Sequence, residues 1–379
     1  MSELPVEQAA KDAFNKIKEV INNLNKINIA VVGKTGVGKS TLINAVFGEE
    51  FAKACVGEPV TTEFRKYTKP ESPLAIYDSP GFDMDEHSPD AVKNDLLKII
   101  DEGIASKDMD KALHCIWYCI STASDRVEES ELKWLAEFTQ ENKRYNVPVI
   151  IILTKSYSKK NAQELKNIID SKMLPVKKVI PVLAQDFIID DMVVSKAYGL
   201  DELVAVMGAV LPEDLQKTWQ NVQKAALEDK VRFAKRIVTA NAVSAAGVGA
   251  SPIPFTDASV LVPLQITMIA EITAVFGVNV SKSFMTAVLA STLGTGGATV
   301  LGRTVVSNLI KLIPGAGSIV GGAISASTAG VITTALGNAY IGIMKMVFSG
   351  EMTVDQFESK DGKKKITELF RQELKNNKD

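Results

Sequence analysis

Cysteine is scarce in this chain of 379 residues, which has only Cys55, Cys115 and Cys119. Three cysteines suit neither a disulfide framework nor a four-ligand metal site, and two of them lie in an apolar run that is typical of a buried strand. This usage indicates a reduced, cytosolic context. The N-terminus also lacks the basic-then-apolar pattern of a secretory signal, so we do not expect export.

A strong excess of one charge is also missing. The formal net charge is -2, which gives no global electrostatic reason to expect a nucleic-acid partner. The length exceeds what one compact core usually accommodates, so two domains are the starting expectation.

Charged residues are rare in most of the second half. Between residues 237 and 350 the ionisable residues are Asp257, Glu271, Lys282, Arg303, Lys311 and Lys345. Residues 312–344 contain none, a length that would cross a bilayer, although glycine and serine replace the leucines of a typical span. Two interpretations stay open: a tightly packed helical bundle, or a domain that inserts into or lies on a membrane.

The most informative feature that is present is a glycine-rich loop at residues 33–40, which reads Gly33, Lys34, Thr35, Gly36, Val37, Gly38, Lys39 and Ser40. An apolar, β-branched run at 27–32 predicts a strand before the loop, and the residues from Thr41 onward predict a helix after it. Successive loop amides and the positive end of that helix would face one anion. Lys39 would reach the β- and γ-phosphates, and the Ser40 hydroxyl would hold Mg²⁺.

Strand and helix patterns alternate after this loop. Strands are predicted at 74–77, 113–120, 148–153 and 178–183, and helices at 91–104, 128–138, 162–173 and 200–211. This alternation predicts an α/β fold whose mostly parallel sheet carries helices on both faces. Ligands of such sheets bind outside the carboxyl ends of the strands.

Two further motifs follow the loop in the order that a nucleotide site requires. Asp78 ends a predicted strand, where its carboxylate can hold Mg²⁺ through water, and the Gly81 amide can contact the γ-phosphate. Thr61 or Thr62, between the two motifs, could supply a second hydroxyl to Mg²⁺. The candidate catalytic residues are therefore Lys39, Thr61 and Gly81, and the candidate metal ligands are Ser40, Thr61, Thr62 and Asp78.

These motifs, with Thr154-Lys155-Ser156 and Val182-Leu183-Ala184 after two later strands, resemble in order and spacing the five motifs of Era-like P-loop GTPases. The resemblance covers about half of the chain. It implies GTP as substrate, Mg²⁺ as cofactor, slow hydrolysis, and a switch near residues 50–65 and 78–90. In the second half, residues 249–257 followed by residues 261–276 resemble a hydrophobic helical domain of unknown function found behind GTPase domains in bacteria.

Two positions depart from that family. The fourth motif normally ends in an aspartate that pairs with guanine, and Tyr157 stands there. The stem of Lys155 could still cover the purine and the Ala184 amide could meet the base oxygen, but guanine selectivity should relax, which leaves an ATPase as one alternative. Phe82 follows Gly81, where Ras-like GTPases place the glutamine that positions water. In Era-like relatives this replacement is usual, and it goes with slow turnover and reliance on dimerisation, a potassium ion or a partner protein.

The chain thus divides into an N-terminal amphipathic helix at 1–25, a GTPase domain at 26–212, a charged connecting helix at 213–236, an all-α hydrophobic domain at 237–350 and a charged C-terminal helix at 351–379. The leading hypothesis is a GTP-binding switch that couples nucleotide state to the helical domain, which docks on a membrane or a protein partner. Homodimerisation through the GTPase domain and a cytoplasmic, peripheral or integral membrane location go with it. A ribosome or RNA assembly GTPase is the other alternative, which the lack of a basic, aromatic-bearing second domain disfavours.

Overall fold

The computed structural model describes residues 5–48, 56–61, 64–70, 72–79, 89–124, 126–249, 257–293 and 326–377. The chain forms two compact units. One comprises Leu24–Asp229, and the other combines Met1–Asn23 with Lys230–Asp379. The division falls inside the first turn of helix α9 (Leu227–Gly249).

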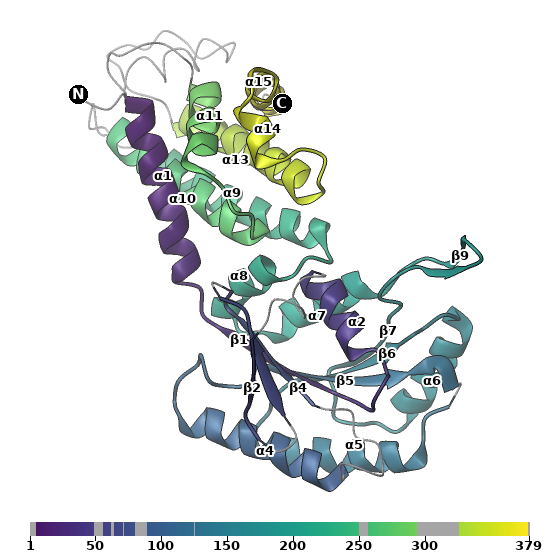
Figure 1. Ribbon diagram of the computed structural model, residues 1–379. Helices are drawn as coiled ribbons and strands as arrows, with labels where there is room; N and C mark the ends of the chain where they lie inside the picture. The colour runs from purple at the N-terminus through teal and green to yellow at the C-terminus, as the bar shows by residue number, and fades with distance from the viewer. Residues whose placement is uncertain are drawn as a thin grey trace. The chain divides into compact units, whose positions relative to one another are not determined.

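The first unit contains a sheet and the helices that cover it (Figure 1). Its described strands are β1 (Ile27–Val32), β2 (Val56–Pro59), β3 (Arg65–Thr68), β4 (Leu74–Asp78), β5 (Cys115–Ser121), β6 (Val149–Thr154), β7 (Lys178–Pro181), β8 (Phe187–Ile189) and β9 (Met192–Ser195). Its described helices are α2 (Lys39–Phe47), α4 (Pro89–Ala105), the 3-10 turn η1 (Thr122–Ser124), α5 (Glu129–Asn142), α6 (Lys159–Ser171), α7 (Leu200–Val210) and α8 (Glu213–Val222).

Seven strands form one sheet in the order β2-β3-β4-β1-β5-β6-β7. Strands β4, β1, β5, β6 and β7 are parallel, and β2 and β3 add an antiparallel edge beside β4. The predicted mostly parallel sheet is therefore confirmed. Strand β2 was not predicted from the sequence, because a four-residue strand with Gly57 and Pro59 carries little β-forming signal.

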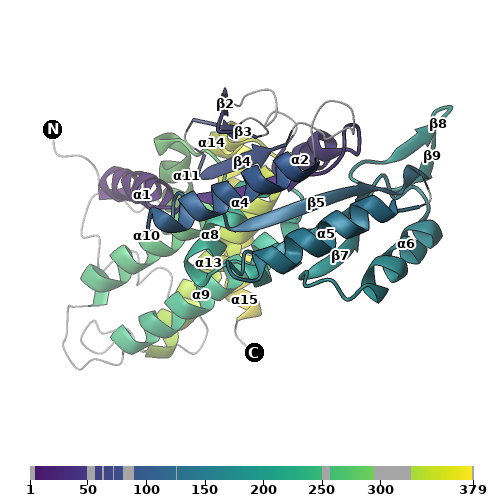
Figure 2. The ribbon, with the colours of Figure 1, turned by 90° about the horizontal axis from the view of Figure 1, so that it is seen from below.

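Apolar side chains fill both faces of the sheet. Strands β1 and β6 are buried at every residue, as expected for parallel strands covered on both sides. Helices α4, α5 and α6 cover one face, where Figure 2 shows them in front of the sheet, and α2, α7 and α8 cover the other. Because side chains alternate along each strand, Val31 and Trp117 enter one core while Val32 and Tyr118 enter the other.

The prediction of one continuous connecting helix at residues 213–236 is wrong. Helix α8 ends at Val222 and α9 begins at Leu227, so the region contains two separate helices. Trp219 on α8 is fully buried, its indole N–H donates to the Val204 carbonyl at 3.0 Å, and its ring meets those of Phe47 and Trp117 edge-on. Helix α8 is therefore part of the core of the first unit.

A β-hairpin that was not predicted from the sequence follows the last strand of the sheet. Strands β8 and β9 pair antiparallel around Asp190 and Asp191, and both of these residues have positive φ, at 47° and 63°. Two such residues make the primed turn that matches the strand twist of a hairpin. The apolar side chains Ile188, Ile189, Met192, Val193 and Val194 are all exposed on it.

The second unit is helical. Its described helices are α1 (Pro5–Asn22), most of α9, α10 (Asp257–Phe276), α11 (Lys282–Leu293), α13 (Ala326–Phe348), α14 (Val354–Glu358) and α15 (Lys360–Asn376). Helix α1 packs on α10 and α11, and Ala9, Ala13 and Ile17 on it are buried. The single C-terminal helix expected at 351–379 is wrong, because Ser359 ends α14 and caps α15.

Small residues allow close packing in this unit. A side chain at Gly337 would lie 2.5 Å from Val238 and 3.1 Å from Met268, so α13 approaches α9 and α10 through a bare backbone. The stretch Ala329–Phe348 is the one described helix that is long and apolar enough to cross a membrane, and 56% of it is buried inside the protein. The uncharged residues 312–325 lie outside the described residues.

Candidate nucleotide-binding site

The glycine-rich loop connects β1 to α2, as its motif predicted. Gly33 has φ of 151°, and a side chain there would lie 2.5 Å from the Cys119 carbonyl oxygen. Gly38 has φ of 103° and forms the N-cap of α2. Only glycine adopts these backbone conformations readily, so the loop can turn its amides toward the start of the helix.

Lys39 lies across this loop. Its buried ammonium donates to the carbonyl oxygens of Gly33, at 2.8 Å, and Lys34, at 3.2 Å. A bound phosphate offers a stronger, charged acceptor than a carbonyl, so the same ammonium can turn to it. Ser40 and Thr41 are exposed in the first turn of α2, where the helix dipole favours an anion.

Asp78 stands at the end of β4, next to the loop, because Val31 of β1 pairs with it. Among the residues that the structure describes, its Oδ1 is one of the few buried side-chain oxygens without a hydrogen-bond partner, and the Ser79 hydroxyl is another. Burial raises the pKa of the Asp78 carboxyl from 3.8 to about 6, while the positive charge of Lys39 opposes that rise.

These oxygens fit a hard cation. A buried carboxylate oxygen without a donor is costly alone, and it suits Mg²⁺ with its retained waters. Ser40 and Asp78 are both predicted as metal ligands, and Ser40 follows Lys39, whose charge acts on Asp78, in the first turn of α2. The donor set therefore fits the cofactor that the motifs imply.

The fourth motif supports the loop from β6. The Thr154 hydroxyl lies 2.5 Å from the Val37 carbonyl oxygen and 3.1 Å from that of Ile120, so it ties the phosphate loop to the sheet. Lys155 adopts φ of 53°, and the Thr122 hydroxyl donates to its carbonyl. The Ser156 hydroxyl faces inward and donates to the Leu153 carbonyl.

A pocket of about 130 Å³ opens beside the loop. Its lining comes from the start of α2, the end of β6 and the chain after β7: Gly38, Thr41, Leu42, Thr154, Lys155, Tyr157, Val182, Leu183, Ala184, Gln185, Asp186 and Phe187. The structure thus brings Thr154, Lys155 and Ala184 to one pocket with Gly38 of the phosphate loop, while their contacts with a base stay predictions. Ser156 is fully buried and does not line this pocket.

Asp186 and Phe187 line the pocket but were not predicted from the sequence. The rings of Tyr157 and Phe187 lie 4.4 Å apart at 41°, and Asp186 stands between Ala184 and Phe187. The available signal was the hairpin pattern of apolar runs on either side of Asp190-Asp191, which places Asp186 at the base of a hairpin directly after the fifth motif.

The remaining predicted residues are only partly described. Thr61 lies in the turn between β2 and β3, where its hydroxyl accepts from the Phe64 amide at 3.0 Å. Thr62, Gly81 and Phe82 lie outside the described residues. The catalytic and metal roles of Thr61, Thr62 and Gly81 stay predictions.

Comparisons with known proteins agree with this geometry. Residues 28–155 match the family model described as 50S ribosome-binding GTPase, and residues 214–379 match that of a domain of unknown function, DUF697. GTPase Era of Clostridium kluyveri is 26% identical over 190 residues, which are 49% of this chain and 56% of that protein. The chloroplastic GTPase ERA1 of Zea mays is 29% identical over 163 residues, or 41% of this chain and 36% of that protein.

A solved structure of Era in complex with MgGDPNP and a 16S ribosomal RNA fragment is also similar, with a TM-score of 0.32 and 22% identity over 58% of this chain and 68% of that one. The matched part of this chain spans 56% of the length of the Clostridium kluyveri protein and 36% of that of the Zea mays protein. Both resemblances inferred from the motifs are confirmed by the family matches. The GTPase match contains Gly33, Asp78 and Lys155, and it ends before Ala184 and Asp186.

Proposed function

The chain joins an Era-like P-loop GTPase domain to a helical DUF697 domain, and from this premise we propose that it is a GTP-binding switch with slow, Mg²⁺-dependent GTP hydrolysis. The observation that carries the proposal is the meeting of the phosphate loop, the Lys39 ammonium and the donorless carboxylate oxygen of Asp78 at adjacent strand ends. A glycine-rich turn without a ligand would have no use for such a buried, unpaired carboxylate.

In this proposal, one group of residues contacts the phosphates and another holds the metal ion. The amides of residues 33–41 and Lys39 stabilise negative charge on the β- and γ-phosphates, and Ser40 and Asp78 hold Mg²⁺. When bound, Mg²⁺ neutralises charge that develops on the phosphates. Thr61 or Thr62 adds a ligand, and the Gly81 amide senses the γ-phosphate.

Lys39→Ala tests the site in the full-length chain. We expect the affinity for a fluorescent GTP analogue to fall about 100-fold or more, because the variant lacks the ammonium that would offset the negative charge of the phosphates. The measurement is equilibrium fluorescence titration with Mg²⁺. Lys98→Ala, which removes an exposed lysine on α4, is the control and should keep wild-type affinity. Equal affinity in the Lys39 variant would contradict the assignment.

Slow turnover follows from Phe82, which cannot orient a water as a glutamine does. Single-turnover hydrolysis should be slow at low protein concentration and rise with concentration if the GTPase domains dimerise. Fast hydrolysis by dilute protein would overturn this part of the proposal.

The helical domain passes the nucleotide state to a membrane or a protein partner. Its support is the low charge of residues 237–350 and the length of the apolar stretch Ala329–Phe348. Flotation with liposomes in the presence of GTP or GDP tests whether the helical domain binds a membrane.

A ribosomal role is the second candidate, because the matched family is described as ribosome-binding and a similar Era structure holds ribosomal RNA. Salt-dependent co-sedimentation with ribosomes would favour it.

A further inference from the structure

The nucleotide pocket contains a carboxylate that the family motifs do not assign. Tyr157 occupies the position where the fourth motif normally places an aspartate, so that motif offers no carboxylate to a base. Asp186 is the only acid among the described residues that line the pocket. We propose that Asp186 supplies the carboxylate that selects guanine, an inference that rests on nucleotide binding at the site proposed above.

Asp186 is held in place from both sides. Leu183 and Tyr198 exchange two backbone hydrogen bonds of 3.0 Å, and Phe187 pairs with Ser195 at the base of the hairpin. Between these two points the Ala197 amide donates to Asp186 Oδ1 at 2.7 Å. The carboxylate is therefore fixed by a backbone donor, although the residue itself is exposed at the pocket.

The chemistry of the two purines decides what such a group can select. Guanine carries adjacent N–H donors at N1 and N2, and a carboxylate accepts from both. The bond from Ala197 uses one lone pair of Oδ1 and leaves the second lone pair and Oδ2 for a base. Adenine presents an acceptor at N1, which would face the carboxylate without a proton between them.

Tyr157 cannot take this role, because a phenol offers one donor and cannot accept from two neighbouring N–H groups as an ionised carboxylate does. Its ring instead packs against Phe187, and the pair forms an aromatic wall of the pocket. Such a wall binds the flat face of any purine and leaves selectivity to the polar group beside it. Tyr157 therefore shapes the pocket while Asp186, one residue before Phe187, reads the base.

The experiment exchanges the carboxylate for an amide. In Asp186→Asn the amide N–H₂ meets the guanine N2–H₂, whereas the C2 carbonyl of xanthine would accept from it. Unlabelled GDP, XDP and ADP compete with a ribose-labelled fluorescent nucleotide on the full-length protein. Wild type should prefer GDP over ADP and XDP, and the variant should lose GDP affinity and gain XDP affinity, each by about tenfold or more.

Asp191→Asn is the matched control, because it removes the same charge at the tip of the hairpin, where asparagine tolerates the positive φ. It should keep the wild-type ratio of GDP to XDP affinity. An unchanged ratio in Asp186→Asn, or wild-type protein that binds ADP as tightly as GDP, overturns the role of Asp186 while nucleotide binding stands. Wild-type protein that binds none of the three nucleotides overturns the proposed function and this inference together.

Discussion

At the scale of single residues, the site combines side chains that would be costly without a ligand. Asp78 is an example, because its carboxylate is buried and one oxygen has no donor among the described residues. Lys39 differs from Asp78, because its buried ammonium already donates to two carbonyl oxygens of the loop. Binding of Mg²⁺ would give the Asp78 oxygen a partner, so part of the binding free energy would come from relief of this cost.

The pKa of Asp78 gives a pH test of that view. Its folded-state pKa of about 6 lies above the ordinary 3.8, so between these values the folded protein holds a proton that the unfolded chain has lost. The nucleotide-free protein should therefore lose stability as the pH rises from 3.8 to 6, by about 3 kcal/mol through this group. Asp78→Asn should remove this loss and be the more stable protein above that interval.

Tryptophan fluorescence during urea unfolding measures this effect in the right unit, because Trp117, Trp134 and Trp219 are the chain's three tryptophans and all lie within Leu24–Asp229. Asp191→Asn controls for loss of a carboxylate elsewhere in the same unit. The same pH dependence in wild type and Asp78→Asn would show that burial of Asp78 does not govern it.

The sequence predicts these residues unevenly. Gly33, Lys39 and Asp78 are recognisable because their chemistry depends on local spacing between a strand and a helix. Asp186 is not, because its place in the pocket depends on a bond to Ala197 and on a hairpin further along the chain. A residue fixed by such a tertiary contact has no local signature.

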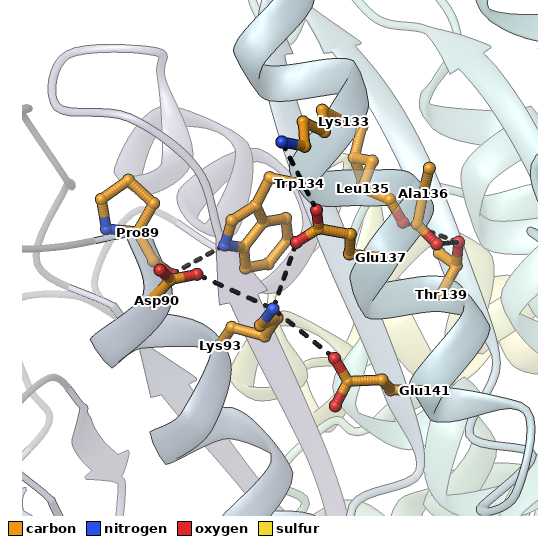
Figure 3. A network of polar contacts seen from close by, with 10 residues as sticks. All are labelled: Pro89, Asp90, Lys93, Lys133, Trp134, Leu135, Ala136, Glu137, Thr139 and Glu141. Atoms are coloured by element: carbon orange, nitrogen blue, oxygen red, sulfur yellow. Dashed lines mark hydrogen bonds and ion pairs between the residues drawn. The ribbon is translucent and has the colours of Figure 1, made fainter.

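At the scale of elements, α4 and α5 are joined by a polar network (Figure 3). Lys93 of α4 lies between Asp90 of its own helix and Glu137 and Glu141 of α5, at 3.3 to 3.7 Å. The Trp134 indole N–H donates to the Pro89 carbonyl at 2.7 Å. The Glu137 and Glu141 side chains are about half-exposed and that of Asp90 is mostly exposed, so solvent screens the ion pairs. The indole bond should therefore hold the start of α4 more firmly.

Trp134→Phe tests this division of roles. The phenyl ring keeps an aromatic contact with Phe138 but cannot donate to Pro89, so the free energy of unfolding should fall by about 1 kcal/mol from the lost bond, plus a packing contribution. Hydrogen exchange should quicken most in the first turn of α4. Lys93→Ala should have the smaller effect on that turn, and the reverse order would contradict the argument.

At the scale of the whole molecule, the alternation of strands and helices predicts the sheet because parallel pairing follows from it. The partner of α1 could not be predicted, because periodicity shows that a helix has an apolar face but does not identify what covers it. Helix α1 packs with α10 and α11, which follow it by more than 200 residues. The charge pattern of α8 likewise gave no sign of Trp219, whose burial assigns that helix to the unit Leu24–Asp229.

The boundary between the units gives the last prediction. The helical family match begins at residue 214, whereas the compact units divide at Lys230, so the two assign α8 differently. If α8 completes the core over Phe47 and Trp117, a fragment of residues 24–229 should fold cooperatively and bind nucleotide. A fragment of residues 24–212 lacks Trp219, and removal of a buried tryptophan alone costs about 3 to 5 kcal/mol, a large share of a domain's stability. Urea unfolding followed by circular dichroism and titration with fluorescent GDP compare the two fragments, and equal stability would assign α8 to the helical unit instead.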